Sequence, residues 1–481
     1  MPSSSRAPER RLSDDAWIEP ERIVELNDAP ERAGDYVLYW MQQSQREPFN
    51  PSLELAIAEA NRLALPVVVG FGLTDAYPEA NARHYTFMLE GLAETARAIE
   101  ARGIRFVIRR GAPDDVAVAL AQRAALLVCD RGYLRPQRAW RKHVAAKAGR
   151  RVVQVEGDVV VPVDVASKRR EIAARTLRPK IMARRDEFLA PLARTRVRVD
   201  AAHLDAQSDV SLDDVEALVR SLRIDQTVAA VETLRGGHSE AGRRLDAFVA
   251  RSLDRYVDDR AQPGDPHVST MSPYLHFGQI SPVEIALAVR GAQTGSANRD
   301  TYLEQLIVRR ELSMNFVSTT PDYDRYVCLP GWAQRTLDAH RGDPRRYVYT
   351  EDELGRAATH DPYWNAAMSE LVLTGFMHNH MRMYWGKKVL EWSASPEAAF
   401  AALLRLNNRY FIDGRDANSY ANVGWVFGLH DRPWPERPIF GSVRYMNAAG
   451  LERKTDIRAY VNRIAALSES SGSRDDALAR R

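Results

Sequence analysis

Apolar and polar positions follow two different periods along the chain, and the change falls near residue 166. Before it, short apolar runs typical of buried strands are separated by stretches with the period of an amphipathic helix. The strand-like runs are residues 35–41, 65–73, 104–111, 125–132 and 150–163. Because strands that alternate with helices form βαβ units, we expect an α/β N-terminal domain over 31–165, with a Rossmann-like parallel sheet.

The loops that follow these strands are candidate binding segments. Ligands of parallel sheets lie beyond the carboxyl ends of the strands, which directs attention to residues 40–46, 71–75 and 130–135. No G-x-G-x-x-G pattern follows the first strand, so the usual dinucleotide fingerprint is absent.

The remaining pattern predicts a linker, a helical domain and two tails. Residues 166–230 are first strongly basic and then acidic, which is typical of an extended connection, and the basic run suits a solvated surface. From 231 to 465 apolar residues recur with a helical period, which predicts an all-helical domain. Residues 1–30 are polar and are predicted to be a disordered tail, and the polar residues 466–481 are predicted to be a flexible tail.

Composition narrows the function classes only slightly. The 481 residues suit two domains, and a net charge of +3 means that any nucleic-acid contact must be local. Two cysteines, Cys129 and Cys328, form neither a disulfide framework nor a zinc site, which favours a reducing, cytoplasmic location. We expect neither a signal peptide nor a membrane span, since no apolar run approaches ~18 residues.

The stretch HNHMRMYWGKK (378–388) first suggests a metal-dependent nuclease. His378 and His380 are two positions apart, however, and would point about 200° away from each other on a helix. They therefore cannot share one metal ion, and no other histidine or cysteine pair supports a metal site. The sequence predicts no metal.

Two tryptophans in the same region lie on one face of a predicted helix. The rings of Trp385 and Trp392 would be roughly 10 Å apart, a distance suited to electron hopping. Trp364 could join them only if the chain reversed, and Gly375 offers the break. Periodicity alone favours core aromatics instead.

Three further segments permit a functional and a purely structural interpretation. STMSPYLHFGQIS (269–281) could hold a pyrophosphate or form a capped turn, and Ser281 with Glu284 predicts a capping box. Asp413 could accept a hydrogen bond from a flavin or a ribose, or could cap a turn. Residues 424–447 alternate aromatics with arginines, as in a nucleobase-stacking surface or a Pro-rich loop that packs under its own tryptophans.

Several ordered segments together resemble the photolyase/cryptochrome family, and specifically the class II cyclobutane pyrimidine dimer photolyases. The resemblance spans 35–456, nearly the whole chain. The segments include YWMQQSQR (39–46), DRGYLRPQRAWR (130–141), STMSPYLHFGQIS (269–281), LIVRRELSMNFV (306–317), THDPYWNAAMSE (359–370), MRMYWGKKVLEW (381–392), LNNRYFIDGRD (406–416) and HDRPWPERPIFGSVRYMN (430–447).

The resemblance implies an FAD-dependent DNA-repair lyase that is driven by blue light. In this family reduced FAD, bound in a bent form, donates an electron to a pyrimidine dimer that has left the DNA duplex, and the cyclobutane ring opens. An antenna chromophore, 8-hydroxy-5-deazaflavin or folate, is expected in the N-terminal domain unless that site is empty. We expect a monomer whose partner is UV-damaged DNA.

The same resemblance assigns roles by position. The residues implied to bind FAD are Tyr256, Ser269, Thr270, Met271, Ser272, Arg382, Asn407 and Asp413. Trp385 would be the proximal electron donor, with Trp364 and Trp392 relaying from the surface. The residues implied to contact the dimer or the DNA are Gln305, Met383, Trp425, Arg432, Trp434, Arg437 and Arg444.

One position departs from the family pattern. The family usually has glutamate where this chain has Gln305, and Glu304 would point about 100° away on the same helix. Glutamine can hydrogen-bond a thymine but cannot donate a proton to a radical anion, so we expect repair to survive with a lower yield. Two other functions stay open at this point, a cryptochrome-type photoreceptor and a flavin-free DNA-binding structural protein.

Overall fold

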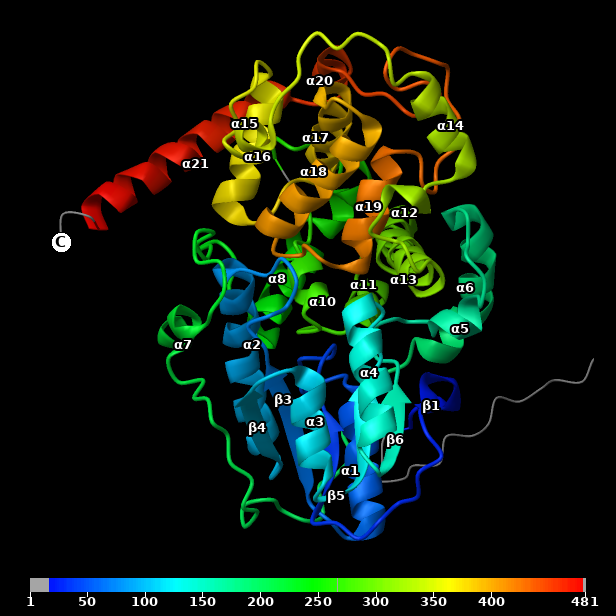
Figure 1. Cartoon of the computed structure of the whole chain (residues 1–481), viewed down its shortest axis with the longest axis vertical. Coiled ribbons are helices and arrows are strands. Elements are labelled where there is room, and N and C mark those ends of the chain that lie inside the picture. The colour runs from blue at the N-terminus through cyan, green and yellow to red at the C-terminus, as the bar shows by residue number, and fades with distance from the viewer. Residues whose placement is uncertain (1–16, 266, 479–481) are drawn as a thin grey trace, which may run out of the picture.

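The computed structural model describes residues 17–265 and 267–478, which form an α/β domain and a helical domain joined by a long connector (Figure 1). A six-stranded sheet with the order β1-β6-β5-β2-β3-β4 is the centre of the α/β domain, and only β1 runs antiparallel to its neighbour. The strands are β1 (Ile23–Glu25), β2 (Tyr36–Trp40), β3 (Val67–Leu73), β4 (Arg105–Arg110), β5 (Ala124–Asp130) and β6 (Arg151–Val155).

The predicted Rossmann-like sheet is confirmed, and its central strands are apolar because helices cover both faces. All residues of β2, β3 and β5 are buried. Leu53 and Ile57 of α1 (Pro51–Leu63) and Leu89 of α2 (Ala82–Glu100) pack on one face of the sheet. Helices α3 (Pro113–Ala121) and α4 (Arg135–Lys147) cover the other face.

Both edges of the sheet are covered by segments that the apolar pattern does not predict. Strand β1 pairs with β6, so the predicted disordered tail 1–30 is wrong for Ile23–Glu25; residues 1–16 lie outside the described residues. At the other edge the connector bonds to β4, where Ile108 N donates to Ser208 Oγ (3.0 Å) and Asp209 N donates to Ile108 O (3.2 Å). Such covers prevent unwanted pairing of the open edges.

Three helices lie on the predicted connector 166–230 or at its start. They are α5 (Val163–Ala166), α6 (Ala174–Phe188) and α7 (Val215–Ser221). In Figure 1, α5 and α6 lie on one side of the molecule and α7 on the other, so the connector passes beneath the sheet before it enters the helical domain.

The predicted helical domain is also observed. Its helices are α8 (His238–Arg251), α9 (Tyr256–Asp259), α10 (Ser272–His276), α11 (Pro282–Gly291), α12 (Ser296–Leu303), α13 (Arg310–Thr319), α14 (Gly331–Ala339), α15 (Glu351–Gly355), α16 (Pro362–Thr374), α17 (Asn379–Trp392), α18 (Pro396–Tyr410), α19 (Ala417–Val426), α20 (Ala448–Lys454) and α21 (Ile457–Leu478). Helix α21 extends into the predicted flexible tail 466–481 and ends at Leu478. A π-helical turn at Glu304–Arg309 joins α12 to α13.

Local signals in this domain are partly confirmed. Gly375 ends α16 with φ +66°, and a Cβ there would lie 2.6 Å from Ile412 Cγ1, so the predicted break is real. Ser281 caps α11 by accepting from Val283 N (3.2 Å). The predicted capping box is wrong because Glu284 instead accepts from His238 Nε2 at 2.9 Å.

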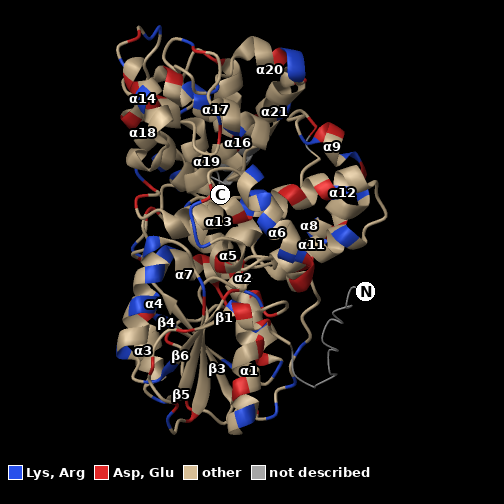
Figure 2. Ribbon diagram, turned by 90° about the vertical axis from the view of Figure 1, so that its right-hand side faces the viewer, with Lys and Arg blue, Asp and Glu red and all other residues tan. Residues whose placement is uncertain are grey.

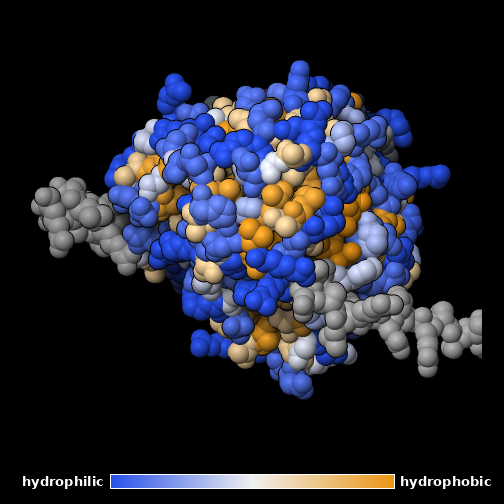
Figure 3. Space-filling view, turned by 90° about the horizontal axis from the view of Figure 1, so that it is seen from below, coloured by the Kyte–Doolittle hydropathy of each residue, from blue (hydrophilic) through white to orange (hydrophobic). Residues whose placement is uncertain are grey.

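The surface is polar and mixed in charge. Lys and Arg alternate with Asp and Glu over both domains (Figure 2), and the face formed by the α/β domain is mainly hydrophilic with some apolar residues near its centre (Figure 3). Among the described residues, no helix combines the length and the apolar character that crossing a membrane requires. Cys129 and Cys328 are both free and buried, and burial raises the pKa of each thiol to about 12.

Candidate functional site

The helical domain encloses a cavity of about 470 Å³. Its walls come from the segment before α10, the π-helical turn, the first turns of α17, the 413–416 loop and α19. The predicted site residues that line it are Tyr256, Ser269, Thr270, Met271, Ser272, Gln305, Arg382, Met383, Asp413 and Trp425. Side chains from positions 256 to 425 therefore converge on one space, although their roles stay predictions.

One wall of this cavity presents hydroxyl groups. Ser269, Thr270 and Ser272 lie on the segment that enters α10, and Tyr302 OH donates to Ser269 Oγ at 3.0 Å. Thr270 has φ +53°, a left-handed conformation that is uncommon outside glycine and often marks a functional segment. Tyr256 packs edge-on against Tyr302, with ring centroids 5.3 Å apart, and stiffens the wall from behind.

An ion pair forms a second wall. Arg382 Nη2 lies 3.1 Å from Asp413 Oδ1, and both side chains are at most 15% exposed. The Arg382 guanidinium also lies 3.7 Å from the ring centroid of Phe411. A Cβ on Gly414 would lie 2.9 Å from Asn407 O, so this glycine allows the 411–414 loop to close tightly on the end of α18. The pair is thus held in one geometry at low exposure.

Of the eight residues implied to bind FAD, Asn407 is the one that does not line the cavity. It lies buried in the last turn of α18, and its Nδ2 donates to Asn408 Oδ1 at 3.1 Å. Its backbone carbonyl lies next to Gly414, beside Asp413. The contact of Asn407 with a cofactor stays a prediction.

The three predicted relay tryptophans form one buried cluster. The rings of Trp364 and Trp385 are stacked with centroids 6.4 Å apart, and those of Trp364 and Trp392 are 5.7 Å apart. Trp364 Nε1 donates to Trp385 O at 3.0 Å. Trp385 packs on Phe411 (6.1 Å), which connects the cluster to the ring under Arg382. The expected chain reversal at Gly375 produces this arrangement.

Two neighbouring polar residues of the π-helical turn point in different directions, as successive residues of any helix do. Gln305 lines the cavity, whereas Glu304 accepts from Arg178 Nη2 at 2.7 Å on the connector side. π-helical turns are rare and frequently occur at functional sites. Glu304 is not among the residues that line the cavity, and its carboxylate is engaged by Arg178. The role of Gln305 in repair stays a prediction.

A buried charge network lies at the end of the cavity nearest the α/β domain. His276 Nδ1 lies 3.4 Å from Asp416 Oδ2, and Arg310 Nη2 lies 2.9 Å from Asp158 Oδ2. Burial alone would raise the pKa of Asp416, but the His276 bond and the Arg310 charge lower it to about 2. Burial raises the pKa of Asp158 to about 6 despite Arg310. Charged side chains from both domains thus meet here.

The histidines of 378–388 have separate positions. His378 precedes α17 as its N-cap, and its Nδ1 accepts from His380 N at 3.2 Å. Burial lowers the pKa of His378 to about 4, which keeps the ring neutral and able to accept. His380 lines the cavity. The interpretation that these residues do not form a metal pair agrees with this capping role.

Four residues predicted to contact DNA lie outside the cavity wall. The Arg444 guanidinium lies 4.2 Å from the ring centroid of Trp434 and 5.5 Å from that of Trp425. Arg432 lies 5.4 Å from the Trp434 ring, and Arg437 is 5.2 Å from the Tyr445 ring. These residues follow Trp425 in the chain and form an arginine–aromatic rim, which we define as residues 431–445.

Several cavity residues were missed by sequence reasoning. They are His276, Arg309, Arg310, Asn379, His380, Asp416, Asn418, Asn422 and His430. Two of them carried a usable signal, because Asn418 and Asn422 are four positions apart and share a face of α19. The others come from separate segments, and no local pattern indicates that they meet.

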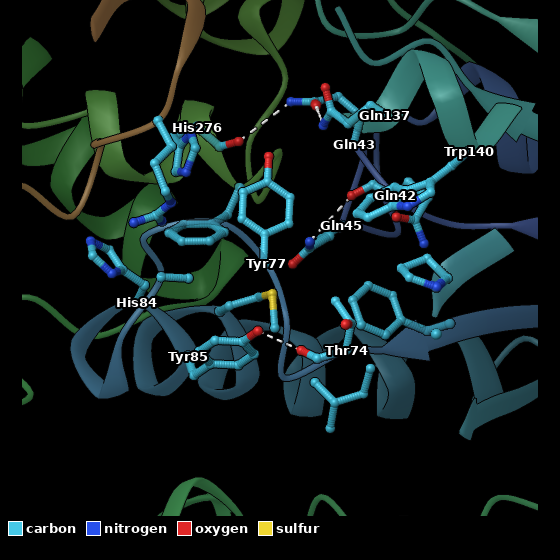
Figure 4. Close-up of a pocket in the computed structure, with 18 residues that line it drawn as sticks. Gln42, Gln43, Gln45, Thr74, Tyr77, His84, Tyr85, Gln137, Trp140 and His276 are labelled. Atoms are coloured by element: carbon cyan, nitrogen blue, oxygen red, sulfur yellow. Dashed lines mark hydrogen bonds between the residues drawn. The ribbon is translucent and has the colours of Figure 1, made fainter. Parts of the chain in front are cut away.

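A second, smaller cavity of about 100 Å³ lies where the α/β and helical domains meet (Figure 4). Gln42, Gln43 and Gln45 come from the loop after β2, and Phe71–Thr74 come from the end of β3, as the strand-end rule predicts. Tyr77 and Trp140 both line the pocket and pack edge-on against each other, with ring centroids 5.9 Å apart. The side chains of Gln42 and Gln45 each carry a buried polar atom, Nε2 and Oε1, that has no protein partner. His276 lines both cavities.

Asp130 fixes the loop that forms this pocket. Its Oδ2 accepts N–H groups from Gln42 (2.9 Å), Gln43 (3.0 Å) and Ser44 (3.0 Å). The third predicted loop, 130–135, therefore contributes an anchor and does not line the cavity. The other cavity residues that sequence reasoning missed are Ala80, His84, Tyr85, Met88, Pro113, Gln137, Trp140, His276, Phe277 and Arg415.

Comparison with known proteins agrees with this geometry. The DNA photolyase family model matches residues 37–197. The deoxyribodipyrimidine photo-lyase of Methanothermobacter thermautotrophicus is 47% identical over 94% of this chain and 100% of its own length. That of Oryza sativa subsp. japonica is 36% identical over 99% of this chain and 97% of its own.

A solved structure shares the fold. A bacterial class III photolyase from Agrobacterium tumefaciens superposes with a TM-score of 0.71 at 21% identity, over 91% of this chain and 88% of its own. At this identity the likeness supports the two-domain fold alone, whereas the two sequence relatives cover nearly the whole chain. The protein therefore belongs to the deoxyribodipyrimidine photo-lyase family.

Proposed function

We propose that this protein is a class II photolyase that repairs cyclobutane pyrimidine dimers in DNA with blue light. The observation that carries the proposal is that seven of the eight residues implied to bind FAD line one cavity together with Gln305, Met383 and Trp425. The buried tryptophan cluster is connected to this cavity through Phe411, which contacts both Trp385 and Arg382. A DNA-repair function also suits the names of the whole-length relatives. The rim of arginines and aromatics beside the opening supports DNA as the partner.

The cavity fits FAD. Its hydroxyl wall at 269–272 suits a pyrophosphate and ribose, and the Arg382–Asp413 pair offers a donor and an acceptor to a polar ring edge. When bound and reduced, FAD would supply the photoexcited electron that opens the dimer. Asn407 would contact the ring edge near its redox-active nitrogen.

The protein's own groups would receive and orient the lesion. Gln305 would hydrogen-bond a pyrimidine carbonyl or N–H, and Met383 with its flexible thioether would cover an apolar base face. Trp425 would stack on a base at the mouth, while the rim at 431–445 would hold the DNA backbone. Trp385, Trp364 and Trp392 would carry an electron inward when the cofactor must be reduced.

The smaller cavity suits a planar antenna chromophore. Aromatic rings of Tyr77, Trp140 and Phe277 line it, and the unpartnered amide atoms of Gln42 and Gln45 can bond to the edge of a ring system. We propose a deazaflavin or a folate as its occupant. The protein would act as a monomer in a reducing, cytoplasmic compartment.

The test is repair of a thymine-dimer oligonucleotide by the reduced protein under blue light. We expect light-dependent repair of the cyclobutane dimer and none of a (6-4) photoproduct, which serves as the substrate control. Repair of the (6-4) product alone would contradict the proposed specificity. Repair of neither would favour a photoreceptor of the cryptochrome type.

The position of Gln305 gives a sharper test of the lesion set. Gln305→Glu restores a proton donor in the cavity, so we expect a higher repair yield per absorbed photon. The yield is measured with chemically reduced protein and saturating substrate, which removes effects on photoreduction and binding. An unchanged yield would show that position 305 has no part in the reaction.

A further inference from the structure

Lys387 carries a buried amino group that the proposed reaction does not use, and burial lowers its pKa to about 7. It lies on α17, directly after Gly386, and it is 0% exposed. Among the described residues, no carboxylate lies within ion-pair distance of its Nζ. Burying an unpaired ammonium is costly, and an apolar side chain of similar volume would usually be more stable there. The presence of a lysine at this place therefore requires an explanation other than stability.

The partners of Lys387 are a backbone carbonyl and an aromatic ring. Nζ donates to Val426 O at 2.5 Å and lies 4.8 Å from the ring centroid of Trp425. Helices α17 and α19 approach closely at this point, because a Cβ on Gly386 would lie 2.6 Å from Val426 Cγ2. This close approach lets the ammonium reach the last turn of α19, where Trp425 forms part of the cavity wall.

Trp425 is also contacted by a second cation on the surface side. Arg444, which is 38% exposed, lies 5.5 Å from the Trp425 ring and 4.2 Å from the Trp434 ring. Asp431 accepts from Arg444 Nε (3.1 Å) and from Trp434 Nε1 (3.4 Å). A series of alternating cations and rings therefore runs from the buried Lys387 through Trp425, Arg444 and Trp434 to the exposed Arg432.

We propose that Lys387 is a positioning residue for lesion binding: its buried ammonium, fixed on the Val426 carbonyl, holds the Trp425 ring at the cavity mouth and anchors the cation–ring series of the rim. The inference rests on the proposed function, because it takes Trp425 as a lesion contact. A cation–π contact is stronger when it is shielded from water. The interior end of the series is therefore the end that can fix the ring, while exposed Arg432 remains free to meet phosphate.

The test is a double-mutant cycle with Lys387→Met and Trp425→Leu, with the dissociation constant of a thymine-dimer oligonucleotide as the readout. Methionine keeps the unbranched stem and removes the charge. We expect Lys387→Met to weaken dimer binding about tenfold in the wild-type background and to have almost no further effect when Trp425 is already leucine. Two groups that act through one contact are non-additive in this way.

Two further measurements separate positioning from damage to the fold. Flavin content and the yield of repair at saturating substrate should stay at the wild-type level in Lys387→Met. Lys388→Met is the matched control, because Lys388 is also buried on α17 but pairs with Glu391 at 2.7 Å, away from the Trp425 ring. We expect this control to bind the dimer as the wild type does.

A failure of the role proposed for Lys387 can be told apart from a failure of the proposed repair function. Full dimer affinity in Lys387→Met, or an equal loss in both backgrounds, would overturn the role of Lys387 while wild-type repair stands. If Lys387→Met loses flavin, Lys387→Gln replaces it in the same cycle, and additivity there overturns the inference. Wild-type protein that repairs no dimer would overturn the proposed function itself.

Discussion

The two cavities differ in what holds their walls in place. Around the small cavity between the two domains, the loop after β2 is fixed by backbone N–H groups that donate to Asp130, and aromatic and amide side chains form much of the lining. Around the large cavity of the helical domain, the walls come from distant segments and depend on charged pairs, such as Arg382–Asp413 and His276–Asp416. The first site is held by one carboxylate that accepts backbone N–H groups, and the second is held by ion pairs between side chains.

This difference suggests that the two sites respond to different kinds of substitution. The small cavity should respond to the loss of a ring from its lining, and its loop should respond to the loss of the single carboxylate of Asp130. A site held by buried ion pairs should fail when one partner is removed, because the other charge is then left without compensation. His276 lines both cavities, so a substitution there should affect both sites.

The largest effect is expected for Asp413→Ala. It removes the carboxylate that accepts from the buried Arg382, and a hydrogen bond to a charged group is worth about 1.5–3 kcal/mol. FAD affinity should therefore fall at least about tenfold, and repair should fall with it, while antenna binding stays intact. The measurement is flavin absorbance per protein after gel filtration.

The control for this prediction is Asp352→Ala, which removes an exposed aspartate whose partner, Arg356, lies on the surface. Exposed pairs contribute little to stability, so this variant should retain its flavin. If Asp413→Ala also retains its flavin, the view that an ion pair holds the helical site is wrong.

A smaller effect, on the antenna and not on FAD, is expected for Trp140→Ala. The indole forms one wall of the small cavity against Tyr77, and an aromatic contact adds about 0.5–1.5 kcal/mol to the burial of its area. Antenna binding should weaken, whereas FAD content and repair under light absorbed by the flavin should stay unchanged. The repair action spectrum should then match the absorption of the flavin alone.

Trp17→Ala is the matched control, since Trp17 is 62% exposed in the same domain. Its action spectrum should equal that of the wild type. A loss of FAD in Trp140→Ala would show that the two cavities are not independent.

The contrast between the two sites also explains what the sequence could predict. The strands of the α/β domain are continuous apolar runs, so the parallel sheet and the loops at its carboxyl ends could be predicted from periodicity alone. Strand β1 could not, because Ile23–Glu25 has no local pattern and its pairing with β6 decides its structure. The amphipathic helices were equally predictable.

The helical site was predictable only in part. Segment resemblance located Arg382, Asp413 and Gln305, and a glycine break brought Trp364 to Trp385. No local signal indicates the π-helical turn at Glu304–Arg309, because its extra residue is accommodated by tertiary packing. The same holds for the approach of Lys387 to Trp425, which depends on how α17 packs on α19.

A buried carboxyl group, that of Glu311, lies at the contact between the two domains, which we call the seam. Glu311 of α13 accepts from Val160 N at 2.6 Å, which is the point where the chain leaves the sheet. Burial raises the pKa of the Glu311 carboxyl to about 8, even though the two backbone N–H groups and Arg310 act to lower it. The folded protein therefore keeps a proton on Glu311 at pH values where the unfolded chain has already lost it.

The smallest expected effect follows from this proton. Because the folded state binds more protons than the unfolded state between the ordinary pKa of 4.5 and about 8, the contribution of Glu311 to stability is complete at low pH and is lost as pH rises through that window. Glu311→Gln keeps an acceptor for Val160 N but cannot ionise, so its stability should fall less steeply with pH. Urea unfolding midpoints at about pH 5 and about pH 8 measure the two slopes, with the exposed Glu216→Gln as the control. Equal slopes for wild type and Glu311→Gln would mean that Glu311 is ionised in the folded protein, and that the seam, like the helical site, is held by charge.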